Sequence, residues 1–199
     1  MSGKRAMKRF DKEAKEWDSS LRRQALAKAV VDNLSKYLTK EDKVLDFGCG
    51  TGLVGLNLAP FVKEVVGIDT SKEMVKIFNE KSKNLNLNAK AFVLDIFEIE
   101  DRFDAVVSSM TLHHIKDIKS LAKKLKDITD RIFIADLFKE DGTFHDRGNE
   151  DVFHFGFSKE DICEIFEGFK VDYKIIHTVK KKRDYPIFLA AITKSKDKR

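Results

Sequence analysis

Short apolar runs recur along the chain from residue 43 onward, and within each run the hydrophobic residues follow one another with little alternation. Such runs are typical of strands that are buried on both faces of a parallel sheet. They predict five strands, at residues 44–47, 63–68, 89–94, 103–108 and 131–136.

Stretches with helical spacing of their apolar residues lie between these strands, at residues 53–59, 71–83 and 117–125. Ser71 is placed to cap the second stretch, and Glu73 is an acid in its first turn; both features are typical of a helix N-terminus. The alternation of strands and helices predicts a doubly wound α/β fold with right-handed crossovers.

The last third of the chain has a different pattern. Residues 158–167 predict a helix that begins after Ser158 as its N-cap and ends at Gly168, and we expect Cys163 to face the core from it. Residues 170–179 and 185–193 predict two strands, and the short connection between them favours an antiparallel pair at one edge of the sheet.

The first 40 residues differ again and predict a separate helical segment. Its apolar stripe consists of Leu21, Ala25, Ala29, Val30, Asn33, Leu34 and Leu38. We therefore divide the chain into an N-terminal helical lid or cap at residues 1–40 and a main domain at residues 41–199. The pattern leaves open whether the segment covers the core or closes over a site.

The composition is that of a folded protein with a densely charged surface: 42% of the 199 residues are hydrophobic and 36% are charged, with a formal net charge of +5. Two cysteines cannot form a disulfide framework, and no zinc-ligand spacing is present. No apolar stretch follows the basic N-terminus, and no run approaches the roughly 18 apolar residues of a membrane span. These features predict a cytoplasmic monomer or homodimer with no membrane partner.

A glycine-rich turn follows the first predicted strand. The strand runs into Gly48-Cys49-Gly50-Thr51-Gly52, and a helical pattern comes next. In open α/β sheets ligands bind at the carboxyl ends of strands, where glycines let the backbone approach a ligand closely. Asp69 ends the second strand, a position at which an acid accepts hydrogen bonds from ribose hydroxyls.

The same loop also has a dinucleotide-type spacing, since Gly50, Gly52 and Gly55 match G-x-G-x-x-G. Asp46 at the mouth of the loop argues against a dinucleotide, because its carboxylate would repel a pyrophosphate and attract a cationic ligand. Two unit charges about 4 Å apart interact by about 4 kcal/mol at an effective dielectric constant of about 20, so the sign of the ligand's charge decides whether the ligand is attracted or repelled. A chain of 199 residues also leaves no room for the second domain that a dehydrogenase usually needs.

The motifs, in this order, resemble those of class I S-adenosylmethionine-dependent methyltransferases of the small-molecule type, similar to the quinone-biosynthesis group. The four matching segments are residues 44–52, 66–71, 91–95 and 103–115. The resemblance implies a Rossmann-like seven-stranded sheet of order 3-2-1-4-5-7-6, with the last strand antiparallel and helices on both faces. It also implies S-adenosylmethionine as the cofactor and S-adenosylhomocysteine as its product.

The resemblance further implies how the cofactor is held. Asp69 would bind the ribose, Met74 would pack on the adenine, and Asp95 would bond the adenine amino group beside Ile96, while Ser108 and Met110 would line the methionine end. The full predicted cofactor set is Asp46, Gly48, Cys49, Gly50, Asp69, Thr70, Met74, Asp95, Ile96 and Ser108.

Four of the five histidines follow the fourth and fifth predicted strands: His113, His114, His145 and His154. Histidine is the natural base near neutral pH, so we predict that one or more of them face the acceptor as catalytic groups. The alternative is that each is a packed or solvated loop residue. We predict no metal, because a four-histidine site here has no fixed ligand spacing.

Aromatic residues mark two further regions. Phe10, Trp17 and Arg22 lie in the N-terminal segment, which resembles the leader of other class I members and implies closure over the cofactor; alternatively its aromatics only pin a helix to the core. Tyr185 lies near the last hairpin and is a candidate on the acceptor side. Phenylalanines and histidines in residues 136–157 favour a partly apolar pocket and hence a small organic acceptor.

The sequence therefore predicts methyl transfer to a small organic acceptor by in-line displacement, with the acceptor atom (O, S, N or C) open. RNA or protein methylation is one alternative, but acids are interleaved with the basic residues, and Pro60 and Pro186 form no Asn/Asp-Pro-Pro-aromatic motif. A nucleic-acid partner is thus not favoured. A non-catalytic nucleotide-binding module is the other alternative.

Overall fold

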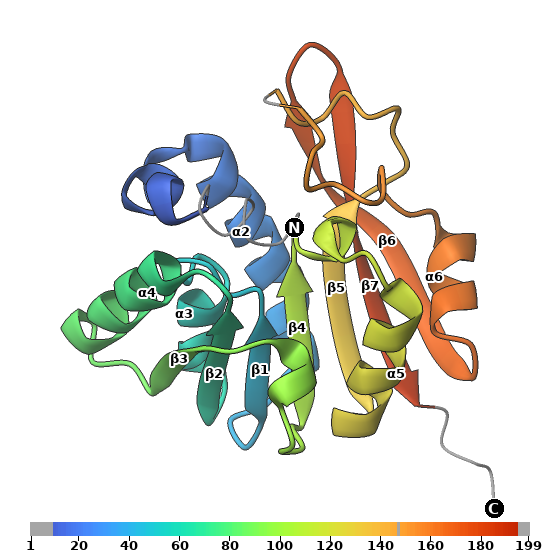
Figure 1. Cartoon of the computed structure of the whole chain (residues 1–199). Coiled ribbons are helices and arrows are strands. Elements are labelled where there is room, and N and C mark those ends of the chain that lie inside the picture. The colour runs from blue at the N-terminus through green and yellow to red at the C-terminus, as the bar shows by residue number, and fades with distance from the viewer. Residues whose placement is uncertain (1–9, 147, 195–199) are drawn as a thin grey trace, which may run out of the picture.

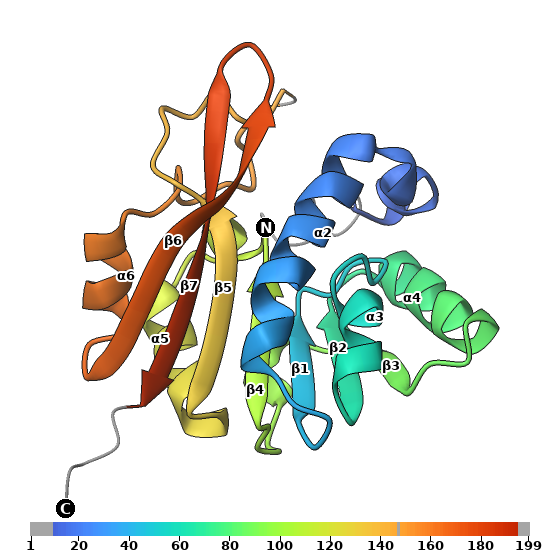
Figure 2. The ribbon, with the colours of Figure 1, turned by 180° about the vertical axis from the view of Figure 1, so that it is seen from behind.

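The computed structural model describes residues 10–146 and 148–194. Residues 1–9 of the predicted N-terminal segment, residue 147, and residues 195–199 of the predicted main domain lie outside the described residues. The described chain folds around one seven-stranded sheet with helices on both faces (Figures 1 and 2).

The sheet has the order β3-β2-β1-β4-β5-β7-β6, which confirms the prediction. Within β1 to β5, every pair of neighbouring strands is parallel. β7 is antiparallel to both β5 and β6. The ends of every predicted strand lie within two residues of an observed strand's ends; the strands are β1 (Lys43–Phe47), β2 (Glu64–Asp69), β3 (Ala89–Val93), β4 (Ala105–Ser109), β5 (Arg131–Leu137), β6 (Phe169–Lys180) and β7 (Asp184–Lys194).

Two layers of helix cover the sheet. The α-helices are α2 (Leu21–Leu34), α3 (Gly55–Leu58), α4 (Lys72–Asn84), α5 (Ile118–Ile128) and α6 (Lys159–Ile165). Short 3-10 helices connect the elements at η1 (Ala14–Ser19), η2 (Ser35–Tyr37), η3 (Ala59–Phe61), η4 (Ile96–Glu98) and η5 (Leu112–His114). Figure 2 shows α2 and α3 in front of the sheet, and Figure 1 shows α5 on the opposite face.

The sheet separates two hydrophobic cores, and successive strand residues serve them in turn. Val44 joins the core shared with α2, α3 and α4, whereas Leu45 joins the core shared with α5 and α6. Both side chains are fully buried. This double burial explains why the central strands read as continuous apolar runs in the sequence.

The predicted helix ends are confirmed by their hydrogen bonds. The Ser71 hydroxyl accepts from the Met74 backbone N–H at the start of α4, and the Ser158 hydroxyl accepts from the Asp161 N–H at the start of α6. Gly168 has a φ of +85°, a left-handed conformation that glycine adopts without strain after a helix.

Three details of the predicted helices are wrong. Cys163 is exposed, because it is next to the buried Ile162 and a helix turns by about 100° per residue. Leu21 is 78% exposed and Ala25 is also exposed, whereas Val30, Leu34 and Leu38 of the predicted stripe are buried. The buried face of α2 also includes three residues that were not predicted: Leu26, Ala27 and Val31. The predicted helix at 53–59 is shorter than expected and ends in a 3-10 turn that contains Pro60.

None of the helices in residues 10–146 and 148–194 combines the length and the apolar content that crossing a lipid bilayer requires.

Candidate cofactor and acceptor site

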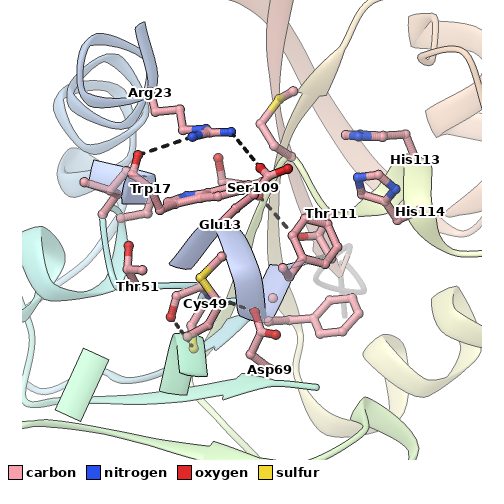
Figure 3. Close-up of a pocket in the computed structure, with 18 of the residues that line it drawn as sticks. Glu13, Trp17, Arg23, Cys49, Thr51, Asp69, Ser109, Thr111, His113 and His114 are labelled. Carbon is pink, nitrogen blue, oxygen red and sulfur yellow. Dashed lines mark hydrogen bonds and ion pairs between the residues drawn. The ribbon is translucent and has the colours of Figure 1, made fainter. Parts of the chain in front are cut away.

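A cavity of about 900 Å³ lies at the carboxyl ends of the parallel strands, and residues of η1 and α2 also line it. One part of its wall, here named the glycine-loop end, consists of residues 46–51, 68–70, 74 and 94–97. The opposite part, the histidine end, consists of residues 109–111, 113–117, 144–146, 148 and 153. Figure 3 shows Asp69 and Cys49 at the first end and His113 and His114 at the second.

The glycine loop is held by backbone hydrogen bonds to the neighbouring strand. The N–H groups of Gly48 and Cys49 both donate to the Ile68 carbonyl, at 2.9 and 3.0 Å. Gly48 and Gly50 have φ values of +72° and +51°, which glycine reaches at little cost. A β-carbon on Gly48 would lie within 2.9 Å of three side-chain atoms of Thr111, so the loop packs directly against the turn that follows β4.

The Asp69 carboxylate accepts hydrogen bonds from backbone N–H groups of two turns. Its carboxylate accepts from the Gly50 N–H at 2.9 Å and from the Ser71 N–H at 2.8 Å. Burial raises the pKa of Asp69, and the backbone N–H groups of Ser71, Gly50 and Thr70 oppose that rise. A carboxylate has about four acceptor positions, so Asp69 keeps capacity for hydroxyl donors in the cavity.

Asp46 is a buried carboxyl group in the cavity wall, with 2% of its surface exposed. Among the described residues its Oδ2 has no hydrogen-bond partner, and a β-carbon on Gly55 would collide with that oxygen. Burial raises the pKa of Asp46 to about 7, helped by repulsion from Asp69 and opposed by the Gly55 backbone N–H. A cationic ligand group beside such a buried carboxyl would stabilise its ionised form.

Apolar side chains complete the glycine-loop end. Met74 and Ile96 are both buried, and Phe97 is 51% exposed in the same wall. Asp95 caps η4 by accepting from the Phe97 N–H at 3.1 Å. Thr70, which is exposed at the end of β2, also lines the cavity.

The N-terminal segment is fastened to the glycine loop and to α4. Asp18 accepts from the Thr51 hydroxyl at 2.5 Å and forms an ion pair with Lys81 at 2.7 Å. Asp11 accepts from the Ser71 hydroxyl at 2.6 Å. Predicted lid residues Phe10, Trp17 and Arg22 all line the cavity, where the Arg23 guanidinium stacks 3.6 Å from the centre of the Trp17 ring (Figure 3).

Three histidines from two loops meet at the histidine end. The ring centres of His113 and His114 lie 4.1 Å apart, and His145 lies 5.1 Å from the first ring and 5.6 Å from the second. His113 is 1% exposed, and its Nδ1 lies 2.6 Å from the fully buried Asp136. The Nδ1 of His114 lies 2.7 Å from the Asp151 carbonyl.

Two pKa shifts follow from this arrangement. Burial and, to a smaller extent, the neighbouring His113 lower the pKa of His114 to about 4. Burial alone would raise the pKa of Asp136, but His113 and the Leu137 N–H more than offset it, so the pKa of Asp136 is lowered. Asp136 is therefore a buried anion with fixed donors.

Three predicted site residues do not line the cavity. The Ser108 hydroxyl is buried and donates to the Phe47 carbonyl at 3.0 Å, while its neighbour Ser109 faces the cavity. His154 contacts the Ile115 carbonyl through Nε2 at 3.0 Å. Tyr185 is buried behind the wall, with its hydroxyl 2.8 Å from that of Thr143.

Sequence reasoning also missed several wall residues and their partners: Glu13, Arg23, Ser109, Thr111 and Asp136. For Asp136 a signal existed, because a carboxylate closes the fifth predicted strand at the edge where ligands bind. For Ser109 no sequence signal existed, since adjacent residues of a strand point to opposite faces of the sheet and the sequence does not say which of the two faces the cavity.

The chain was compared with known proteins. Residues 44–131 match the model of the methyltransferase domain family. An uncharacterised methyltransferase of Schizosaccharomyces pombe is 38% identical over 145 residues, which are 62% of this chain and 51% of that protein. A ubiquinone biosynthesis O-methyltransferase of Pelagibacter ubique is 30% identical over 105 residues, 50% of this chain and 44% of that protein. The chain thus spans about half the length of the curated relatives it matches.

Solved structures share the fold at low sequence identity. The complex of DhpI with SAH has a TM-score of 0.74 at 16% identity and covers 96% of both chains. Magnesium protoporphyrin IX methyltransferase from Synechocystis PCC 6803 with bound SAH has a TM-score of 0.67 at 18% identity, covering 87% of this chain and 83% of that one. In its family match over residues 44–131 and in its strand order, the chain is similar to the class I S-adenosylmethionine-dependent methyltransferases.

Proposed function

We propose that this protein transfers the methyl group of S-adenosylmethionine to a small organic acceptor by in-line displacement. The observation that carries the proposal is one cavity with two chemically different ends. An acidic, backbone-lined end suits the cofactor, and an aromatic and histidine-rich end suits an acceptor. We also propose that the protein is a monomer or homodimer in the cytoplasm.

The glycine-loop end offers a complementary group for each part of the cofactor. Asp69 would accept hydrogen bonds from the ribose hydroxyls, and Met74 and Ile96 would hold the adenine between apolar surfaces, with Asp95 at its edge. Asp46 would face the cationic methionine part of the cofactor, whose positive charges favour its ionised form. Gly48, Cys49, Gly50 and Thr70 would contribute backbone surface.

The histidine end supports a small acceptor. Ligand cavities of about 300–1,000 Å³ hold drug-sized molecules, and this one, at about 900 Å³, has room for a cofactor together with a modest acceptor. The sulfonium donor is already activated, so catalysis depends on holding the acceptor in line with the methyl group and on excluding water. His113, His114 and His145 would face the acceptor, whereas His154 contacts the Ile115 carbonyl outside the cavity wall.

The cofactor assignment is tested by calorimetric titration with S-adenosylmethionine and with S-adenosylhomocysteine. Wild type should bind with micromolar affinity, and Asp69→Ala should bind at least about 100-fold more weakly, since each hydrogen bond to a charged group contributes about 1.5–3 kcal/mol. Asp101→Ala, which removes an exposed acid outside the cavity wall, is the matched control. Absence of binding to wild type would overturn the proposal.

The acceptor class is tested with methyl-labelled cofactor and three sets of acceptors: small thiols, phenols and amines; bulk RNA; and mixed peptides. Labelled small-molecule product is the expected result. Label found only in RNA or peptide would replace the proposed acceptor by a polymer. Tight cofactor binding without transfer to any set would favour a non-catalytic module.

A further inference from the structure

The geometry points to a metal site that sequence spacing did not predict: we propose that His113, His114 and His145 bind one divalent transition-metal ion of the zinc type at the histidine end of the cavity. The sequence gives these residues no regular ligand spacing, because His145 comes from a different loop. The fold brings them together, and His154, the fourth histidine of these loops, lies outside the cavity wall.

The distances fit a shared ion after small side-chain rotations. One ring nitrogen from each histidine lies within 4.8 Å of the others. Around a tetrahedral zinc ion with Zn–N bonds of about 2.0–2.1 Å, ligand nitrogens lie about 3.4 Å apart. His114 and His145 are only partly buried, and their rings can close that difference, whereas His113 is fixed in the wall.

Outer hydrogen bonds already orient two of the three rings. The Nδ1 of His113 lies 2.6 Å from Asp136 Oδ1, and the Nδ1 of His114 lies 2.7 Å from the Asp151 carbonyl. Both contacts leave the Nε2 atom of the ring for an ion. Metal-binding histidines almost always donate their other N–H to a carboxylate or a backbone carbonyl, which is the arrangement of these two residues.

Asp136 is itself held in place. It accepts from the Leu137 N–H at 2.7 Å and from the His113 N–H at 3.3 Å, so its position is determined by the end of β5. An anchored anion behind a histidine raises the basicity of that ring as a ligand. An ion bound in front of the ring would in turn compensate the buried negative charge.

Three protein ligands at the edge of a cavity leave one coordination position open, as in catalytic rather than structural zinc sites. Imidazole ligands suit zinc, copper, nickel and iron, and do not suit magnesium or calcium. The open position would face the cavity that also holds the glycine-loop end.

The consequence for the reaction rests on the proposed function. A thiol or hydroxyl acceptor R–XH would bind the ion as R–X⁻ and release its proton to water. The lone pair of X then forms the C–X bond to the methyl carbon, and the C–S bond breaks with its electron pair passing to the sulfonium sulfur. The products are R–X–CH₃ and neutral-sulfur S-adenosylhomocysteine, so charge and atoms balance.

The test uses tag-free, full-length protein. After chelator treatment, Co²⁺ is titrated while its visible absorption is recorded, and Zn²⁺ affinity is measured by competition. Wild type should bind one ion per chain, with the absorption of a tetrahedral nitrogen site. His145→Gln and His114→Gln should each weaken binding by more than about 100-fold, beyond the 10–100-fold loss that removing an outer partner causes. His154→Gln, in the same loop region but outside the wall, should stay within about threefold of wild type.

S-adenosylhomocysteine titration of the same variants separates the two proposals. Unchanged cofactor affinity shows that the variants are folded and that the glycine-loop end is intact. If wild type binds no ion, or if His145→Gln and His154→Gln bind it equally, the metal site is refuted while the proposed function stands. If metal binding is lost as expected but no cofactor binds, the metal site stands and the proposed function fails.

Discussion

The glycine-loop end of the cavity is formed by turns at the ends of neighbouring parallel strands, whereas the histidine end is assembled from side chains on separate loops. At the first end the contacts are backbone hydrogen bonds to a single carbonyl and a single carboxylate, those of Ile68 and Asp69. At the second end they join residues that are distant in sequence, such as His114 and Asp151. One end is thus determined by local geometry, and the other by long-range packing.

The irregular residues 138–157 are joined to the rest of the protein by backbone and side-chain hydrogen bonds. The Phe138 N–H donates to the Pro186 carbonyl at 2.9 Å, and the Phe153 N–H donates to the His113 carbonyl at 2.9 Å. A loop held in this way can change its sequence without disturbing the sheet. A cofactor end fixed by the fold and an acceptor end carried on loops allow one architecture to serve different acceptors.

The largest effect is expected where the two ends touch. In Gly48→Ala the new β-carbon would collide with Thr111, and φ at this position is +72°. We expect a loss of about 2–5 kcal/mol in unfolding free energy, since left-handed backbone costs roughly 1–2 kcal/mol and overpacking about 1–3 kcal/mol. Denaturant unfolding measures it, and cofactor affinity should fall with it.

Gly168→Ala is the control for backbone strain alone. Its φ is +85°, but apart from its chain neighbours no atom of the described residues lies within 4 Å of the added carbon. It should lose only about 1–2 kcal/mol and keep full cofactor affinity. Equal losses in the two variants would mean that the contact between the two ends contributes nothing.

The next largest effect is a pH dependence of stability that arises from Asp46 at the glycine-loop end. The pKa of Asp46 is about 7 in the fold, against 3.8 for an ordinary aspartate, so the folded protein without cofactor holds a proton that the unfolded chain releases. The contribution of this group to stability is complete below pH 4, falls between about pH 4 and 7, and is lost above pH 7, by up to about 4 kcal/mol. Asp46→Asn should remove this decline, which thermal unfolding between pH 4 and 8 measures.

Cofactor affinity should rise with pH, whereas the stability of the cofactor-free protein should fall. Because the ionised carboxylate would face cationic groups, wild-type affinity for S-adenosylhomocysteine should rise between pH 6 and 8, and Asp46→Asn should bind about tenfold more weakly at pH 8. A variant that is both more stable and a weaker binder would identify Asp46 as a functional group held at the expense of stability. Unchanged affinity would contradict its assignment.

The contrast between the two ends also explains what the sequence could predict. The strands, the glycine loop and Asp69 were predictable because buried parallel strands and their turns have local patterns, whereas the strand order was implied by the resemblance to a known family. The meeting of His145 with His113 and His114 was not, since no periodicity relates a loop residue to another loop. The resemblance implied Ser108, whereas Ser109 faces the cavity; an apolar run without alternation does not reveal which of these two strand residues faces which side.

The smallest effect should come from the N-terminal segment, which covers the cavity without building either end. Asp18 joins it to the glycine loop through Thr51 and to α4 through Lys81. Both partners of this ion pair are about one-third exposed, with side-chain exposures of 34% and 30%. Asp18→Ala should therefore weaken S-adenosylhomocysteine binding by only about 5–10-fold, near 1 kcal/mol, and the loss should shrink in high salt.

Asp32→Ala is the matched control, because it removes an ion pair with Lys28 on the same segment, at 2.5 Å, on the exposed side of α2. Its cofactor affinity should equal that of wild type. If Asp18→Ala also binds as tightly as wild type, the segment is a cap on the core and not a lid. A loss in Asp18→Ala alone would make closure of this segment a step in cofactor binding, and it would appear in the dissociation rate, since a fastened lid must open before the ligand leaves.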